Sequence, residues 1–320
     1  MKTTAGHVTT ITALLRRTLF PVEPPPSQAW STAFDDPDVG TIAVTGRLSA
    51  PANARDVILL VHGLGGSSES GYLASAALAV HAMGLASLRL NLRGADGNGG
   101  DFYHGGLTAD LHAAIAALTN GGFEHVFVLG YSLGGHVALR FATEVEHPEV
   151  RAVGAVCSPL DLAAGADALD RPAMALYRAY VLRRLKENFR KAGSAGKVPA
   201  AVDEIRNVTT LRQWDSLTVV PRFGFADADD YYRRASVGPL LERLRCPALL
   251  LATENDPMVP PGSIRPFSEI ADDRGLTTRW LADGGHLGFS RRLDLGQVGP
   301  PGPDHQIPLW LLEAGETTAG

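Results

Sequence analysis

The stretch HVFVLGYSLGGHVALRFA, residues 125–142, decides the fold class, because it joins a strand-forming run directly to a helix-forming run. Residues 125–130 are apolar and rich in β-branched and aromatic side chains, and residues 133–145 are typical of a helix. The turn between them reads GYSLG, and its two glycines leave room for a very tight bend. Such a turn exposes the serine hydroxyl at a helix N-terminus, where free N–H groups stabilise negative charge. Ser132 is therefore the candidate nucleophile.

Strand-like and helix-like runs alternate along most of the 320-residue chain, of which 45% is apolar. This alternation predicts the α/β class, with a mostly parallel central sheet flanked by helices on both faces. Functional residues of such sheets lie in the loops that follow the strands. The expected strands are 41–48, 56–61, 85–90, 125–130, 150–156, 248–252 and 277–281. The expected helices are 9–19, 73–83, 107–118 with Thr108 as its N-cap, and 133–145.

One segment interrupts this alternation. Residues 162–236 contain no clear strand and read as helical, although a strand-and-loop unit stands on either side of them. We expect them to form a helical lid or cap, inserted over the carboxyl edge of the sheet. Residues 1–161 and 237–320 would then be the N-terminal and C-terminal parts of a single core.

The acid that orients a catalytic histidine is expected after the nucleophile and before the histidine in the chain. Asp256 fits best, because it lies in the loop that follows the expected strand 248–252. Glu254 competes with it but stands too close to the strand end, where solvent exposure is the simpler interpretation. Asp283 is a third candidate, only three residues before the histidine chosen below, which would require an unusual local geometry.

The general base is expected to be a late histidine. Only His286 and His305 follow the acid in the chain. His286 stands in the glycine-rich loop DGGHLG, residues 283–288, whose glycines let an imidazole swing over the sheet edge toward Ser132. His305 stands in a Pro- and Gly-rich segment and is expected to be solvated. The sequence thus predicts Ser132, His286 and Asp256 as nucleophile, base and orienting acid.

The HGLGG run at residues 62–66, just after the expected strand 56–61, predicts an oxyanion hole made of backbone N–H groups. We expect the amide of Leu64 to be one donor and the amide of Leu133, the residue after the nucleophile, to be the other. Gly65 is the alternative to Leu64, because the uncertainty of such an assignment is one residue.

Composition narrows the classes of partner. The net charge of −5 and the pI near 6.1 do not favour nucleic acid. Cys157 and Cys246 are too few for a disulfide framework, and each is expected to be a buried free thiol. A metal site built from His62, His136 and His286 is conceivable, but their spacing does not demand one, so no metal or organic cofactor is expected.

The apolar runs are only long enough for strands, and no signal-peptide pattern follows Met1, so a cytoplasmic location is expected. A monomer is expected as the default oligomeric state.

Several further motifs resemble the YheT-type subgroup of the α/β-hydrolase superfamily, a set of esterases related to the mammalian ABHD group of membrane-associated esterases and phospholipases. The matching segments together extend from about residue 6 to residue 290. They are GHVTTI and LRR at 6–17, NLRG at 91–94, YHGGLTADL at 103–111, SPLDL at 158–162, and GF with DYY and a serine between 224 and 236. Three departures stand out: Val8 and Thr9 follow the histidine of the first motif, Ser158 replaces a common asparagine, and residues 254–256 read END where a DDP-like run is more usual.

The resemblance implies an α/β-hydrolase fold and a carboxylic-ester hydrolase that works through an acyl-Ser132 intermediate. An apolar inner face of the lid would favour short- to medium-chain acyl groups. An acyltransferase, a phospholipase or a lactonase with the same three residues, and a catalytically silent scaffold, stay open as alternatives. A haloalkane dehalogenase is disfavoured, because that chemistry needs a carboxylate at the elbow.

Two features of the resembling segments have structural interpretations. Arg89, Arg93 and Asp110 are expected to form a buried ion pair, and the aromatic side chains of 223–232 are expected to pack the lid onto the core. Within the lid, residues 177–191 form a basic amphipathic stretch. It is expected to be a solvated helix face, with peripheral membrane contact as the alternative.

Overall fold

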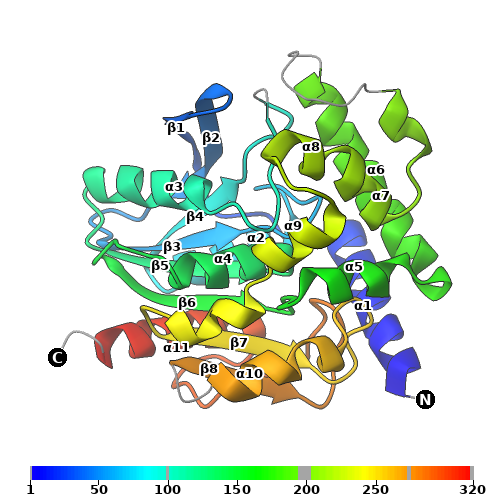
Figure 1. The fold of residues 1–320 in the computed structure, drawn as a ribbon. Helices are drawn as coiled ribbons and strands as arrows, with labels where there is room; N and C mark the ends of the chain where they lie inside the picture. The colour runs from blue at the N-terminus through cyan, green and yellow to red at the C-terminus, as the bar shows by residue number, and fades with distance from the viewer. Residues whose placement is uncertain (1, 99–100, 194–202, 272–274, 318–320) are drawn as a thin grey trace.

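The computed structural model describes residues 2–98, 101–193, 203–271 and 275–317 of the chain (Figure 1). In these ranges eight strands form one sheet in the order β1-β2-β4-β3-β5-β6-β7-β8. Strand β2 runs antiparallel to β1 and to β4, and all the other neighbouring strands run parallel. The strands are β1 (Gln28–Asp36), β2 (Gly40–Ser49), β3 (Asp56–Val61), β4 (Ala86–Asn91), β5 (His125–Tyr131), β6 (Val150–Val156), β7 (Ala248–Thr253) and β8 (Leu276–Leu281).

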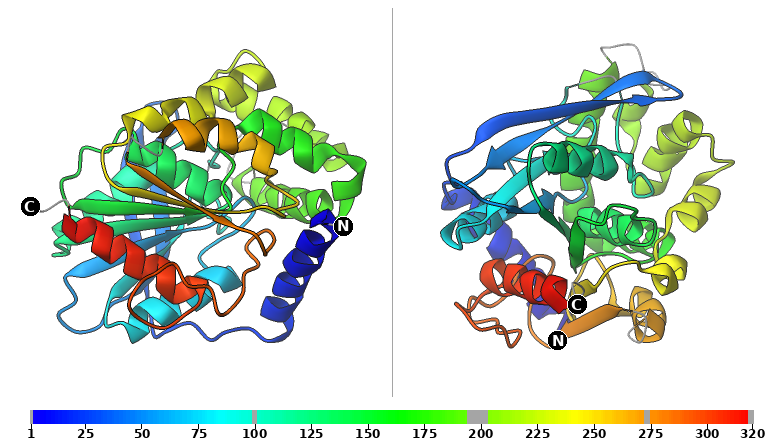
Figure 2. Two further views of the ribbon diagram at one scale, coloured as in Figure 1. Left: turned by 90° about the horizontal axis from the view of Figure 1, so that it is seen from below. Right: turned by 90° about the vertical axis from the view of Figure 1, so that its left-hand side faces the viewer.

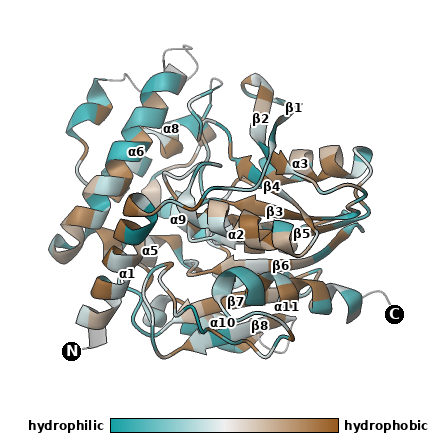
Figure 3. Ribbon diagram, turned by 180° about the vertical axis from the view of Figure 1, so that it is seen from behind, coloured by the Kyte–Doolittle hydropathy of each residue, from teal (hydrophilic) through white to brown (hydrophobic). Residues whose placement is uncertain are grey.

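The central parallel strands are buried along nearly their whole length. In β3, β4 and β7 almost every residue is buried, because helices cover both faces of the sheet. This is why β3 and β7 read as apolar runs in the sequence, whereas β4 also buries Ser87 and Arg89. Both ends of each expected strand agree with the structure to within one residue. Hydrophobic residues are concentrated in these strands (Figure 3).

Strand β1 was not predicted. It lies at the edge of the sheet and pairs with β2 alone, so its side chains alternate between exposed and half-buried positions. Trp30 and Phe34 pack against the core, whereas most of the residues between them are polar. An edge strand with so few apolar residues gives a weak signal in the sequence.

Helices cover the sheet on both faces (Figure 2). One face carries α2 (Gly71–Ala82) and α11 (Pro303–Thr317), and the other carries α3 (Ala109–Asn120), α4 (Leu133–Ala142) and α10 (Arg265–Ala271). Helix α11 was not predicted, because Pro308 interrupts its pattern and a Pro- and Gly-rich segment precedes it. His305 therefore lies on a helix and is partly buried, not in a solvated loop.

The expected cap of α3 is wrong in its chemistry. Thr108 stands at the N-cap position, but its side chain makes no capping bond to the helix backbone. Its hydroxyl donates instead to the Glu144 side chain. The bond to Glu144, a residue distant in the sequence, thus takes the place of the expected bond to the backbone of α3.

The expected buried ion pair between Arg93 and Asp110 is present, but Arg89 is not part of it. Arg93 is almost fully buried and contacts three carboxylates, Asp36 at 2.9 Å, Asp101 at 3.1 Å and Asp110 at 2.8 Å. Arg89 does not join them, because its guanidinium donates to the Ser68 carbonyl at 2.8 Å. The cluster around Arg93 ties the edge strand β1 to the loops that follow β4.

The described part of residues 162–236 is helical, between β6 and β7 (Figure 1). Its aromatic residues pack as expected, since the Phe223 and Tyr231 rings lie 4.3 Å and 5.3 Å from the His104 ring. Helix α1 (Lys2–Leu19) lies at the same end of the sheet as this segment (Figure 2). The helices of residues 162–236 are α5 (Leu162–Asp170), α6 (Ala175–Gly193), α7 (Leu211–Leu217), α8 (Val219–Phe223) and α9 (Ala228–Ala235), with short 3₁₀ turns at Pro172–Met174 and Glu204–Asn207. Within the described ranges, no helix has both the length and the apolar composition needed to cross a bilayer.

Candidate active site

Ser132 stands at the turn between β5 and α4, in a backbone conformation that L-residues rarely adopt. Its φ of 53° and ψ of −122° place the side chain at the carboxyl edge of the sheet, directly before the first turn of α4. The glycines of the turn are required by space: a methyl group on Gly130 would lie 2.2 Å from the Gly134 carbonyl oxygen. A methyl group on Gly134 would in turn lie 2.3 Å from the His62 carbonyl oxygen. The motif GYSLG thus forms the tight elbow that the sequence predicts.

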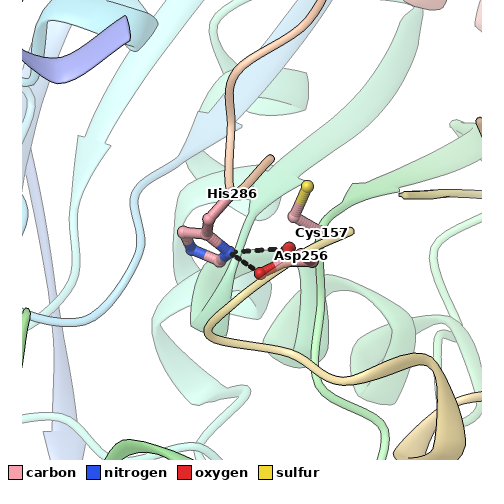
Figure 4. A group of neighbouring side chains, drawn as sticks. All are labelled: Cys157, Asp256 and His286. Carbon is pink, nitrogen blue, oxygen red and sulfur yellow. Dashed lines mark hydrogen bonds and ion pairs between the residues drawn. The ribbon is translucent and has the colours of Figure 1, made fainter. Parts of the chain in front are cut away.

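The structure brings the predicted nucleophile, base and acid together. His286 Nε2 lies 3.0 Å from the Ser132 hydroxyl oxygen, and His286 Nδ1 lies 2.9 Å from Asp256 Oδ2. The imidazole and the carboxylate are both buried, and Figure 4 shows the ring edge turned toward the carboxylate. The three residues come from the turns and loops after β5, β7 and β8, all in the half of the sheet formed by β5 to β8.

Asp256 is held by its own loop. Its Oδ1 accepts the backbone N–H groups of Met258 at 2.8 Å and Val259 at 3.0 Å, which fixes the carboxylate opposite the imidazole. The competing acids lie elsewhere. Glu254 pairs with Arg265, and Asp283 is exposed.

The loop after β3 lies directly over Ser132. A methyl group on Gly63 would be 3.0 Å from the Ser132 Cβ, so the next amide, that of Leu64, stands close to the nucleophile. Within the described residues, the amides of Leu64 and Leu133 have no hydrogen-bond acceptor. The alternative donor Gly65 is engaged, because its N–H donates to the Tyr103 hydroxyl at 2.8 Å. Of the three candidate donors, the amides of Leu64 and Leu133 are therefore the two that are free to bind an oxyanion.

Tyr72 and His62 keep this loop in place. The Gly63 N–H donates to the Tyr72 hydroxyl at 2.9 Å, and His62 Nδ1 lies 2.8 Å from the Gly63 carbonyl oxygen. His62 is fully buried, and burial lowers its pKa to about 4, so the ring is neutral. Sequence reasoning missed Tyr72, because a tyrosine at the start of a helix carries no signal of this role.

Helix α1 supports the loop that carries His286. The buried Thr10 hydroxyl accepts the His286 backbone N–H at 2.8 Å, and the Arg17 guanidinium donates to the Leu287 carbonyl at 2.8 Å. A methyl group on Gly285 would lie 2.4 Å from the Gly6 carbonyl oxygen, so helix and loop are in direct backbone contact. Both Gly6 and Arg17 belong to the opening motif of the chain, whose role the sequence alone did not indicate.

Both cysteines are free thiols as predicted, but only Cys157 is buried, and Cys246 is partly exposed. Cys157, at the end of β6, lies beside the acid and base (Figure 4). Its sulfur, together with one side-chain atom each from Asp256 and His286, would fit within the reach of a single metal ion. Burial, reinforced by the nearby Asp256 carboxylate, raises the pKa of the Cys157 thiol well above its usual value, and its Sγ accepts the Leu287 N–H at 3.4 Å. A protonated thiol is a poor ligand, and the other two groups bond each other, so this cluster does not fit a metal.

The metal site conceivable from His62, His136 and His286 does not form. His136 is buried with Nδ1 2.8 Å from the Pro159 carbonyl oxygen and Nε2 2.9 Å from that of Ala235. Both of its ring nitrogens are thus used to join α4 to the segment after β6 and to α9. This is the structural role that the sequence favoured for it.

A cavity of about 610 Å³ opens at Ser132. It is bounded by α1, by the loops after β3 and β4, and by α5 to α9, and its walls are mostly apolar. Ile11, Leu133, Leu162, Val181 and Phe189 are among the side chains that line it. Its volume lies in the usual range for small-molecule sites.

Comparisons with known proteins identify the family of the chain. A model of the alpha/beta hydrolase family matches residues 58–295, about three quarters of the chain. The chain belongs to the alpha/beta hydrolase family. The fold that the sequence predicted is thereby confirmed, and the matched range includes all three residues of the site.

Two relatives show which members of the family this chain is similar to. It is 30% identical over 253 residues to "Putative esterase YheT" of Escherichia coli, covering 75% of this chain and 72% of that one. It is 25% identical over 252 residues to "Phospholipase ABHD3" of Mus musculus, covering 74% of this chain but only 59% of that one. The predicted resemblance to YheT-type proteins and their mammalian relatives is confirmed.

A solved structure shows the same fold at low identity. The esterase Pf2001 of Pyrococcus furiosus superposes with a TM-score of 0.53 at 15% identity, over 92% of each chain. At that identity the likeness concerns the alpha/beta hydrolase fold alone.

Proposed function

We propose that this protein is a serine hydrolase that cleaves carboxylic esters of short- to medium-chain acyl groups through an acyl-Ser132 intermediate. The observation that carries the proposal is the continuous contact from Ser132 through His286 to Asp256, at 3.0 Å and 2.9 Å, beside two free amides. The names of its relatives, an esterase and a phospholipase, agree with ester hydrolysis.

In the first half of the reaction, the Ser132 oxygen attacks the ester carbonyl carbon while its proton passes to His286 Nε2. The carbonyl electron pair moves onto oxygen, and the resulting oxyanion is stabilised by the amides of Leu64 and Leu133. Asp256 holds the imidazole in the correct tautomer and stabilises the imidazolium. As the intermediate collapses, the bond to the alcohol oxygen breaks and the alcohol leaves with the proton from His286.

In the second half, water repeats the attack on the acyl-enzyme. His286 takes a proton from water as its oxygen bonds to the acyl carbon, and the same two amides stabilise the second oxyanion. The acyl–Ser132 bond then breaks, the proton returns to the serine oxygen, and the carboxylic acid is released. An alcohol in place of water would give acyl transfer with the same residues.

The cavity supports an acyl chain as the bound part of the substrate. Its apolar walls would stabilise methylene groups by about 0.8 kcal/mol for each one removed from water. The described helices α5 to α9 supply much of these walls, which supports the proposal that residues 162–236 act as a lid over the carboxyl edge.

The rim of the cavity supports a substrate that arrives from a lipid surface. Four apolar side chains on α1 and α6, those of Ile11, Leu14, Leu176 and Tyr180, line the cavity and are also 40–82% exposed. Exposed apolar side chains around a pocket mouth are costly in water and are stabilised by contact with amphiphiles. We therefore include peripheral membrane contact, through α1 as well as the lid, in the proposal.

The deciding experiment compares the wild type with Ser132→Ala, using a fluorophosphonate probe and a series of p-nitrophenyl esters from acetate to palmitate. We expect labelling of the wild type alone, and hydrolysis that peaks at a short or medium acyl chain. A folded wild type that neither reacts with the probe nor hydrolyses any ester would overturn the proposal in favour of a silent scaffold. Added alcohols, lactones and phospholipids in the same assay would separate the acyltransferase, lactonase and phospholipase alternatives.

A further inference from the structure

Asp215 is a carboxylate on the inner face of the segment that covers the cavity. It belongs to α7, where Leu211, Trp214 and Thr218 are buried, and its position between them places it on the same face of the helix. It lines the same cavity as Ser132. An apolar side chain is what the helical pattern predicts there, because the neighbouring inward positions are mostly apolar.

The structure provides only part of the bonding that this carboxylate requires. Asp215 Oδ2 accepts the Tyr232 hydroxyl at 2.7 Å, and no other hydrogen bond or ion pair of its side chain is found in the described ranges. Arg212, the cation that acts on this carboxylate, is engaged by Asp167 at 3.2 Å and by Asp229. A carboxylate can accept about four hydrogen bonds, so Asp215 keeps accepting capacity toward the cavity.

A tyrosine adds a second polar group to this part of the cavity wall. The Tyr231 hydroxyl oxygen accepts the Gly105 N–H at 3.1 Å, and in the described chain no acceptor is found for its own proton. Tyr231 and Tyr232 line the cavity beside Asp215, with their ring centres 5.1 Å apart. One carboxylate and two aromatic rings that bear hydroxyls therefore stand in the part of the wall where Leu211, Trp214 and Val219 are the apolar lining residues of α7 and α8.

We propose that the Asp215 carboxylate, flanked by the rings of Tyr231 and Tyr232, forms a subsite that binds a hydrogen-bond donor, a hydroxyl or an ammonium group, carried by the acyl arm of the substrate. The proposal rests on the proposed ester hydrolysis and names its substrate class. A plain alkyl chain would cover the Asp215 carboxylate without giving it a partner, which is unfavourable for a buried polar group. An arm that ends in a donor would restore the missing bond, and an ammonium would also be attracted to the aromatic rings.

The test compares p-nitrophenyl esters of plain, ω-hydroxy and ω-dimethylammonio acids, matched in length from hexanoate to dodecanoate. The protonated dimethylamino group keeps one N–H donor together with its positive charge. We expect the wild type to prefer one substituted series over the plain esters by roughly tenfold or more in kcat/KM, at the length that reaches Asp215. Asp215→Leu should reverse that preference. A preference for plain esters at every length, unchanged in Asp215→Leu, would overturn the proposal.

Asp215→Asn separates the two donors. Its amide oxygen still accepts the Tyr232 hydroxyl and can accept a substrate hydroxyl, so this variant should keep most of a preference for ω-hydroxy esters. It carries no charge, so a preference for the ammonium series should be lost. Tyr232→Phe removes the bond between α9 and α7 but leaves the carboxylate, so it should keep the preference if the carboxylate itself binds the donor. A Tyr232→Phe variant that loses the preference as fully as Asp215→Leu would assign the effect to lid structure instead.

The pH dependence gives a second readout. The pKa of Asp215 is raised to about 7, mainly because the carboxyl group is buried. The hydrogen bond from Tyr232 and the charge of Arg212 lower this pKa, whereas the charge of Asp170 on α5 raises it. If the donor is an ammonium, the KM for that series should fall as pH rises through neutrality, because ionised Asp215 binds the cation. The KM for plain esters should not show this change, and Asp215→Asn should remove it.

Binding measurements on the inactive variant Ser132→Ala test the subsite separately from ester hydrolysis. Titration calorimetry of Ser132→Ala with the matched ester pairs measures the preference without hydrolysis. Tighter binding of a substituted ester supports the subsite even if the wild type hydrolyses none. Equal binding of each pair would overturn the subsite, whereas hydrolysis of plain esters would leave the proposed function standing.

Discussion

At the scale of single residues, the candidate site is built from backbone conformations that are unfavourable by themselves. Ser132, Cys157 and Leu287 have φ values of 53°, 50° and 54°, in the left-handed region that non-glycine residues rarely occupy. Each such residue costs on the order of 1–3 kcal/mol and persists only where its surroundings hold it. All three lie in or beside the contact between nucleophile, base and acid, so the strain is concentrated where precise positions are needed.

Substitution of the acid tests the assignment of Asp256. In Asp256→Asn the loop can stay in place, because the amide oxygen still accepts the N–H groups that now reach Oδ1, but the amide no longer stabilises an imidazolium. We expect kcat to fall by roughly 10³–10⁴-fold with little change in KM, as when the orienting acid of such a triad is neutralised. Stopped-flow or steady-state hydrolysis of the best p-nitrophenyl ester measures it.

Glu254→Gln is the matched control for Asp256→Asn. It makes the same kind of change two residues away, on a partly exposed side chain that pairs with Arg265. Because partly exposed ion pairs contribute little, we expect kcat to stay within about twofold of the wild type. A large fall in kcat for Glu254→Gln together with a nearly unchanged kcat for Asp256→Asn would assign the orienting role to Glu254.

At the scale of elements, α1 acts as a brace that contacts the loops of Asp256 and His286 and helix α6. A methyl group on Gly6 would lie 1.7 Å from the Asn255 carbonyl oxygen, so the helix touches the loop of the acid as closely as it touches the loop of His286. His7 reaches the other way, with Nδ1 3.1 Å from the Tyr177 hydroxyl on α6. The helix is thus placed to couple the position of α6 to the positions of Asp256 and His286.

Thr10→Val tests this brace. Valine has the same shape but cannot accept the His286 N–H, which would be left unsatisfied at a cost of about 1–3 kcal/mol. We expect a lower melting temperature together with a fall in kcat of roughly tenfold and a smaller change in KM, because the imidazole loses its fixed position. Thr12→Val, on the exposed face of the same helix, should change neither. A Thr10→Val variant that is less stable but has unchanged kcat would limit α1 to a structural role.

The same elements show how far sequence reasoning reached. The buried strands, the elbow and the order Ser132, Asp256, His286 were predictable, because apolar runs and glycine turns are local signals. The brace and the edge strand β1 were not, because their contacts join residues far apart in the chain, as Thr10 and His286 do across 276 positions. Asp215 also gave no signal, since a single acidic residue in a short helix is ordinarily a solvated one.

At the scale of the whole molecule, charge is distributed unevenly. The sequences of α1 and α6 carry net charges of +3 and +5, in a chain whose net charge is −5. These two helices also carry the exposed apolar side chains at the mouth of the cavity, with Leu176 82% exposed and Leu14 42% exposed. Cationic groups around exposed apolar ones match the surface of an anionic bilayer.

We therefore expect the protein to sediment with vesicles that contain phosphatidylglycerol and much less with vesicles of pure phosphatidylcholine. Each basic side chain near an anionic surface contributes about 1 kcal/mol, so added salt should weaken the binding. Leu176→Ser should reduce it by roughly tenfold, since burying a leucine contributes about 1.5–3 kcal/mol. Val298→Ser is the matched control, because Val298 is 98% exposed but does not line the cavity, and it should bind as the wild type does. Equal loss in both variants, or no preference for anionic vesicles, would show that the mouth of the cavity does not face a membrane and that substrate enters from water.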